Sequence, residues 1–183
     1  MAGPFTVLVT LLAMAGTLKV ADPRPTGAAL ADAGLPSHLL WVRTLGVFEL
    51  AVAAAALSFG GWAPAAVIAV TYLGFATFVG RSLRTGATTS CGCFGRSEAP
   101  MTWHHVAYNV AAAGAAVAAA VTGVGPLSTT LADQPGAGIP FLALTAVATY
   151  LSVLVLTVLP ATRAAADPSS HRPVPSFTLA DKR

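Results

Sequence analysis

Five long apolar segments constrain the fold of this sequence more than any other feature. They extend over about residues 3–18, 39–59, 63–80, 103–124 and 139–159. A helix of about 20 apolar residues, with ~17 as the lower limit, crosses the hydrocarbon core of a bilayer. Only 9% of the residues are charged, which is too few to cover a water-facing surface. We therefore predict an all-α bundle of five transmembrane helices surrounded by the lipid bilayer.

The first apolar segment is the shortest, and its Ala13-Met14-Ala15 triplet resembles a signal-peptidase site. A secretory signal peptide begins with a basic region, whereas no Lys or Arg precedes Lys19. We therefore interpret residues 3–18 as a membrane span.

Basic residues predict the orientation of the bundle. With the amino terminus outside, the internal segments 19–38, 81–102 and 160–183 contain all but one of the ten Lys and Arg residues, and the external segments contain none. The exception, Arg43, lies about 6 Å inside the second span, within reach of the surface. The positive-inside rule then predicts a multi-pass protein of the bacterial inner membrane with a cytoplasmic carboxyl terminus. The basic residues form no cluster, so we expect no nucleic-acid partner.

Two cysteines with one residue between them form the strongest candidate site. Cys91 and Cys93, in the segment between the third and fourth spans, are the only cysteines of the chain. In an extended chain their Cα atoms would be ~6.6 Å apart, so a disulfide requires a bend, which Gly92 permits. Strained, exposed disulfides are typically oxidising and labile. The pair favours redox chemistry, while an inert pair is the plain alternative.

A metal site is a second alternative for the same segment. Thiolates and imidazoles bind zinc, and His104 and His105 lie near Cys91 and Cys93 at one membrane surface. The spacing matches no strong zinc signature, and adjacent histidines point in different directions on a helix. We expect no bound metal, with both histidines in the headgroup region beside Trp103.

Glu49 lies at the middle of the second span. A carboxylate there costs at least ~2.5 kcal/mol and normally faces the interior of the bundle, which makes it a candidate functional residue. Arg43 lies roughly 240° away around the same helix, so the spacing does not imply a pair. Tyr72 and Asn109, on the next two spans, are candidate partners. A protonated Glu49 bonded to a neighbouring helix is the alternative.

Several of these residues together resemble the MauE-like family of methylamine utilisation proteins, within the wider DoxX-like group of integral membrane proteins. The matching features are Gly16-Thr17-Leu18-Lys19-Val20-Ala21-Asp22-Pro23, Glu49, Cys91-Gly92-Cys93-Phe94-Gly95 and Asn109. The family's usual basic residue before the asparagine is Tyr108 here. The resemblance covers about residues 5–122. It implies a four-helix core in residues 1–124, followed by the fifth span and a flexible cytoplasmic tail in residues 160–183.

The resemblance also implies a role in maturation, because the family's namesake is needed for maturation or export of the disulfide-rich small subunit of methylamine dehydrogenase. We predict thiol–disulfide exchange at Cys91 and Cys93, with Glu49 and Asn109 as further site residues. The expected partner is a thioredoxin-like protein or a cysteine-rich exported client. No cofactor motif is evident, but cysteines on the cytoplasmic side must pass electrons across the bilayer, through a bound quinone or a partner subunit. The alternative function is a small-solute or metal carrier using Glu49 and the Cys91/Cys93 segment.

Overall fold

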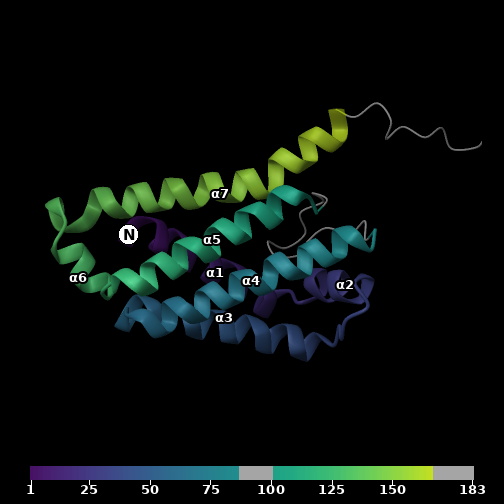
Figure 1. Ribbon diagram of the computed structural model, residues 1–183, viewed down its shortest axis with the longest axis horizontal. Helices are drawn as coiled ribbons and strands as arrows, with labels where there is room; N and C mark the ends of the chain where they lie inside the picture. The colour runs from purple at the N-terminus through teal and green to yellow at the C-terminus, as the bar shows by residue number, and fades with distance from the viewer. Residues whose placement is uncertain (87–100, 167–183) are drawn as a thin grey trace, which may run out of the picture.

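The computed structural model describes residues 1–86 and 101–166. Every regular element within these two ranges is helical (Figure 1). The elements are α1 (Ala2–Ala21), α2 (Arg24–Asp32), α3 (Leu39–Phe59), α4 (Trp62–Arg84), α5 (Trp103–Thr122), α6 (Leu127–Ala132), the 3-10 helix η1 (Pro135–Gly138) and α7 (Ile139–Ala166). The prediction of an all-α protein is therefore confirmed.

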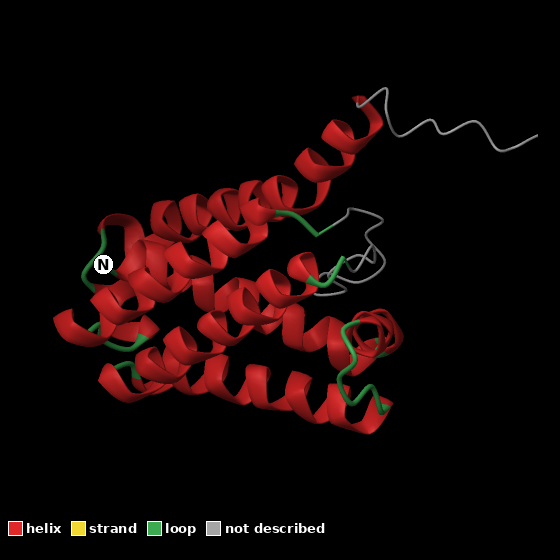
Figure 2. Cartoon of the chain, turned by 45° about the vertical axis from the view of Figure 1, so that its right-hand side comes forward, coloured by secondary structure: helices red, strands yellow, loops and turns green. Residues whose placement is uncertain are grey.

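Five of these helices are long and apolar enough to cross a bilayer: α1, α3, α4, α5 and the Ile139–Val158 part of α7. They correspond to the five predicted spans, and α3 has the predicted bounds. Figure 2 shows the long helices running side by side, as expected for a polytopic bundle. The described chain is thus a multi-pass membrane protein.

The end of α1 differs from the prediction. The helix continues to Ala21, so Lys19 lies inside a spanning helix and not in the first internal segment. The helix stops where Asp22 adopts an extended backbone with φ −132° and ψ 92°. Pro23 causes this stop, because its ring disfavours the helical conformation of the residue before it.

Two connecting regions also contain more helix than we predicted. The segment between the first two spans forms α2, which has a proline in its first turn. Helix α7 continues to Ala166, so the first part of the predicted flexible tail, residues 160–166, is helical. This part is rich in alanine, which has the highest helix propensity. The rest of the predicted tail lies outside the described residues.

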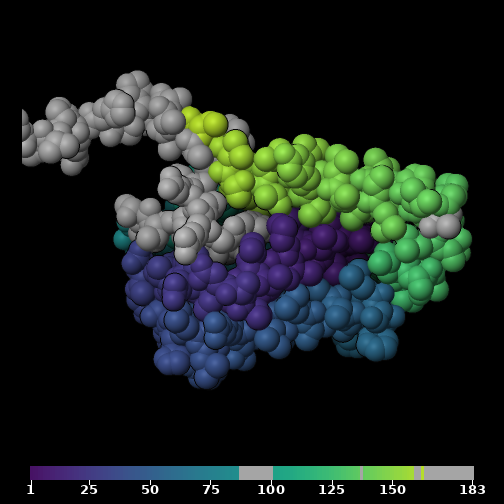
Figure 3. Space-filling model, turned by 180° about the vertical axis from the view of Figure 1, so that it is seen from behind, coloured from purple at the N-terminus to yellow at the C-terminus, as the bar shows by residue number. Residues whose placement is uncertain are grey.

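Helix α1 has the largest buried share of the five spanning helices. It packs against α3, α5 and α7, and Figure 3 shows it between α7 and α3 on the rear face. The most extensive interface joins α4 to α5, and small residues of α5 such as Ala112 and Ala116 share a core cluster with Ile68 and Tyr72 of α4. The interface between α3 and α4 is much smaller, although these helices are consecutive.

The two ends of the bundle carry different elements. One end holds α2, the last turn of α4 and the first turn of α5, and we call it the α2 end (Figure 1). The opposite end holds the amino terminus, α6 and the turn between α3 and α4. That turn is held to the end of α5 by a 2.7 Å hydrogen bond from the Gly61 N–H to the Val124 carbonyl.

Candidate functional site

Lys19 and Glu49 form an ion pair in the interior of the bundle. The Lys19 ammonium donates a 2.8 Å hydrogen bond to Glu49 Oε2. The two side chains are 2% and 0% exposed, although both lie on membrane-spanning helices. A lone charge at such a position is costly, and pairing with an opposite charge offsets much of that cost.

Two glycines bring the charged residues together. A Cβ atom at Gly16 would lie 2.8 Å from the Gly46 carbonyl oxygen, and one at Gly46 would lie 2.7 Å from the Gly16 carbonyl oxygen. Only glycine therefore permits α1 and α3 to approach so closely at this point. Lys19 and Glu49 each follow the glycine of their own helix by one turn, on the same helix face. The glycine contact thus sets the distance between the two charges.

Among the described residues, the ion pair retains hydrogen-bonding capacity that no other group uses. Glu49 Oε1 is buried and accepts no hydrogen bond from the described residues. A lysine ammonium has three N–H donors, and Glu49 takes one. The Lys19 Nζ also lies 5.2 Å from the centre of the Phe75 ring, a cation–π distance. The site can therefore bind a further small polar group.

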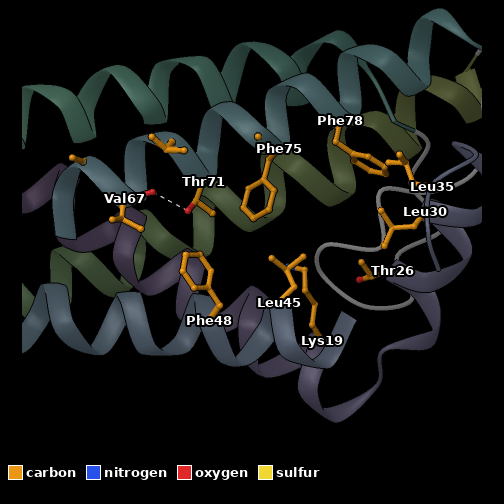
Figure 4. Close-up of a pocket in the computed structure, with 13 residues that line it drawn as sticks. Lys19, Thr26, Leu30, Leu35, Leu45, Phe48, Val67, Thr71, Phe75 and Phe78 are labelled. Atoms are coloured by element: carbon orange, nitrogen blue, oxygen red, sulfur yellow. Dashed lines mark hydrogen bonds between the residues drawn. The ribbon is translucent and has the colours of Figure 1, made fainter. Parts of the chain in front are cut away.

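Lys19 also borders a cavity of about 620 Å³ that lies between α3 and α4. The lining is mostly apolar, and Figure 4 shows Phe75 of α4 and Phe48 of α3 entering the space between their helices. Thr26 of α2 and the loop residue Leu35 close the α2 end of this cavity. A volume of this size is typical of small-molecule sites.

The cavity opens to the lipid-facing side of the bundle. Two of its lining residues, Phe48 and Val70, are 47% and 69% exposed on spanning helices. The opening is therefore toward the membrane, and a ligand with access through it must be soluble in lipid.

The polar side chains predicted as partners of Glu49 donate their hydrogen bonds to backbone carbonyls. The Tyr72 hydroxyl donates a 2.8 Å hydrogen bond to the Leu8 carbonyl, and the Asn109 amide donates a 2.7 Å bond to the His105 carbonyl. Arg43 is exposed, as its predicted place near the surface requires. The residue that bonds to Glu49 is instead Lys19, which the sequence did not predict as its partner.

His104 and His105 differ in their surroundings. His105 is 6% exposed, its Nδ1 accepts a 3.2 Å bond from the Thr102 N–H, and its Nε2 lies 2.8 Å from the Leu156 carbonyl oxygen. His104 is exposed. Both ring nitrogens of His105 thus have protein partners, and the residue joins α5 to α7. Within residues 1–86 and 101–166, no three His, Cys, Asp or Glu side chains form a metal-binding group.

The redox pair predicted at Cys91 and Cys93 lies outside the described residues. The flanking helices are described: α4 ends at Arg84 and α5 begins at Trp103, both at the α2 end. The alternative metal set, which needs both cysteines, likewise stays a prediction.

Comparison with known proteins identifies the family of the chain. The family model of the methylamine utilisation protein MauE matches residues 2–124, which include α1 to α5. No curated protein and no solved structure matches the chain. The matched region contains Lys19, Glu49, both cysteines and Asn109, so it agrees with the resemblance found in the sequence. The chain belongs to the MauE family of methylamine utilisation proteins.

Proposed function

We propose that this protein carries out thiol–disulfide exchange through Cys91 and Cys93 and thereby supports the maturation of exported proteins from the bacterial cell membrane. The observation that carries the proposal is the interface between α4 and α5, the most extensive in the bundle. These two helices flank the segment that contains both cysteines. Reactive residues are commonly placed on a loop whose two ends are fixed by a rigid scaffold.

The chemistry requires the two cysteines and a protein partner, one of them as a disulfide and the other as a dithiol. A thiolate of one molecule attacks a disulfide sulfur of the other, forms a mixed disulfide and displaces a thiolate. A second thiolate then resolves the mixed disulfide, so that one molecule leaves as a disulfide and the other as a dithiol. The same mixed disulfide forms whether this protein oxidises or reduces its partner. The proposed partners are a thioredoxin-like protein and a cysteine-rich exported client.

Redox trapping in intact cells tests this function. Cells are quenched with acid and treated with a thiol-reactive reagent of high mass, so that reduced and oxidised chains separate on a gel. We expect both forms in the wild type, and a complete shift to the reduced form after brief treatment with a membrane-permeant reductant. Ser97→Ala, in the same segment, is the matched control and is expected to behave as the wild type.

The exported proteins give the second readout. The double variant Cys91→Ser/Cys93→Ser is expected to leave cysteine-rich exported proteins in a more reduced state than the wild type does. A chain that stays fully reduced under oxidising growth, together with unchanged exported proteins in the double variant, would contradict the proposal.

A further inference from the structure

The cavity between α3 and α4 combines three properties that narrow the choice of ligand. It opens toward lipid, aromatic side chains enter it, and a buried lysine borders it. The lysine has N–H donors beyond the one that Glu49 accepts. A ligand for this site must therefore be lipid-soluble, fit beside aromatic rings and carry a hydrogen-bond acceptor.

We propose that this cavity binds the ring of a membrane quinone, with the Lys19 ammonium donating a hydrogen bond to a ring carbonyl. The planar ring matches the space between Phe48 and Phe75, which project from opposite helices (Figure 4). The isoprenoid tail of the quinone leaves through the lipid-facing opening beside Val70. The charge of Lys19 complements the partial negative charge of the carbonyl oxygen.

A phospholipid acyl chain is the competing occupant. An acyl chain would fill the apolar part of the cavity but would accept no hydrogen bond from Lys19. Burial makes an unused donor or acceptor expensive. The ring carbonyl of a quinone accepts a hydrogen bond from Lys19, which lines the cavity, whereas a hydrocarbon chain does not.

The inference rests on the proposed function for its redox step. When the Cys91 and Cys93 thiols form a disulfide, they release two electrons and two protons, and the quinone takes up both pairs to become a hydroquinone. Helix α4 connects the two sites, because Phe78 lines the cavity and the helix ends at Arg84, about 9 Å further along its axis. A mobile quinone would then carry the electrons away from the cytoplasmic side, where the charge pattern places the cysteines.

Two glycines provide a matched pair of variants for the binding test. Gly74 lines the cavity, whereas Gly114 lies on α5 and does not line it. A Cβ atom at either position would have no neighbouring atom within 4 Å, so both positions tolerate a side chain. Gly74→Phe places a ring at the cavity, and Gly114→Phe makes the same change elsewhere on the lipid-facing surface.

The full-length chain in lipid nanodiscs is titrated with a benzoquinone that carries one isoprenyl unit, and binding is measured by calorimetry against empty nanodiscs. We expect saturable binding in the wild type and in Gly114→Phe, and a loss of about tenfold or more in Gly74→Phe. Binding no greater than in empty nanodiscs, or equal affinity in the two glycine variants, overturns the proposal. Recovery of a phospholipid from the cavity in place of the quinone overturns it as well.

Two further variants test the lysine and separate this inference from the proposed function. Lys19→Met/Glu49→Leu removes both charges while keeping side chains of similar volume, and we expect it to fold and to lose quinone affinity by about tenfold. Unchanged affinity would overturn the role of Lys19.

Cys91→Ser/Cys93→Ser is expected to bind the quinone like the wild type but to reduce none of it. If the wild type binds the quinone but its dithiol does not reduce it, the quinone is not the electron acceptor of the cysteines. If the wild type exchanges disulfides with proteins but binds no quinone, only the assignment of the cavity is overturned.

Discussion

Lys19 of α1 and Glu49 of α3 are joined at 2.8 Å at the point where Gly16 and Gly46 bring the two helices into contact. The ion pair and the glycine contact depend on each other. The glycines allow the charged groups to meet, and the ion pair offsets much of the cost of two isolated charges inside the bundle. Because Lys19 also borders the cavity between α3 and α4, this contact connects the stability of the helix pair to the candidate ligand site.

The ion pair predicts that single substitutions are more destabilising than the double substitution. Lys19→Met or Glu49→Leu alone leaves one buried group without its partner and is expected to destabilise the protein by about 3–5 kcal/mol. The double variant is expected to be about as stable as the wild type. Thermal unfolding in detergent, followed by the loss of monodisperse protein, measures the difference. Single variants that unfold at the wild-type temperature would contradict the assignment of an energetically coupled pair.

The glycine contact predicts that a methyl group added at Gly46 forces α1 and α3 apart. In Gly46→Ala the new Cβ would lie 2.7 Å from the Gly16 carbonyl oxygen, and overpacking of this kind costs about 1–3 kcal/mol. Gly114→Ala, on a spanning helix with open space at the Cβ position, is the control. Its expected effect is neutral or stabilising by up to about 1 kcal/mol, because alanine favours helix over glycine. Equal stability of the two variants would show that the close approach has no energetic role.

The sequence predicted the five spanning helices because each is an apolar run of sufficient length, and such runs need no tertiary contact to be found. It did not predict the partner of Glu49. The span assigned to α1 ended before Lys19, since hydropathy falls at a lysine, whereas the backbone stays helical until Pro23 takes effect. The one feature of the sequence that could have indicated this pair is the glycine one turn before each charged residue. The packing of α1 against α3, however, depends on the tertiary structure. A single sequence does not contain it.

His105 is expected to fasten α7 to the rest of the bundle. The Leu156 carbonyl that it contacts belongs to the spanning helix with the smallest buried fraction. His105→Ala removes this bond, at a cost of about 1–3 kcal/mol because the carbonyl is left without its partner. Hydrogen exchange in nanodiscs is expected to become faster in α7 while α4 stays protected. His104→Ala, at the exposed neighbour, serves as the control, and a similar change in both variants would contradict the contact.

The orientation in the membrane is tested by reporter fusions. Apart from Lys19, which lies within α1, the basic residues still fall at one side of the predicted topology. The positive-inside rule therefore predicts a cytoplasmic carboxyl terminus. Alkaline phosphatase is expected to be inactive when fused after Arg183 and active when fused at Gln134, in the predicted external segment. An active fusion at Arg183 would reverse the orientation and move the cysteine segment to the outside.

The most direct measurement for the proposed function is mixed-disulfide trapping with the two single cysteine variants. If Cys91 and Cys93 take part in exchange, removal of the resolving thiol leaves the attacking thiol joined to its partner. Cys91→Ser and Cys93→Ser are therefore expected to differ. One accumulates an adduct that appears on a non-reducing gel and disappears on reduction, and the other does not, while both lose function. The absence of an adduct from both variants, with full activity in the double serine variant, would contradict the account.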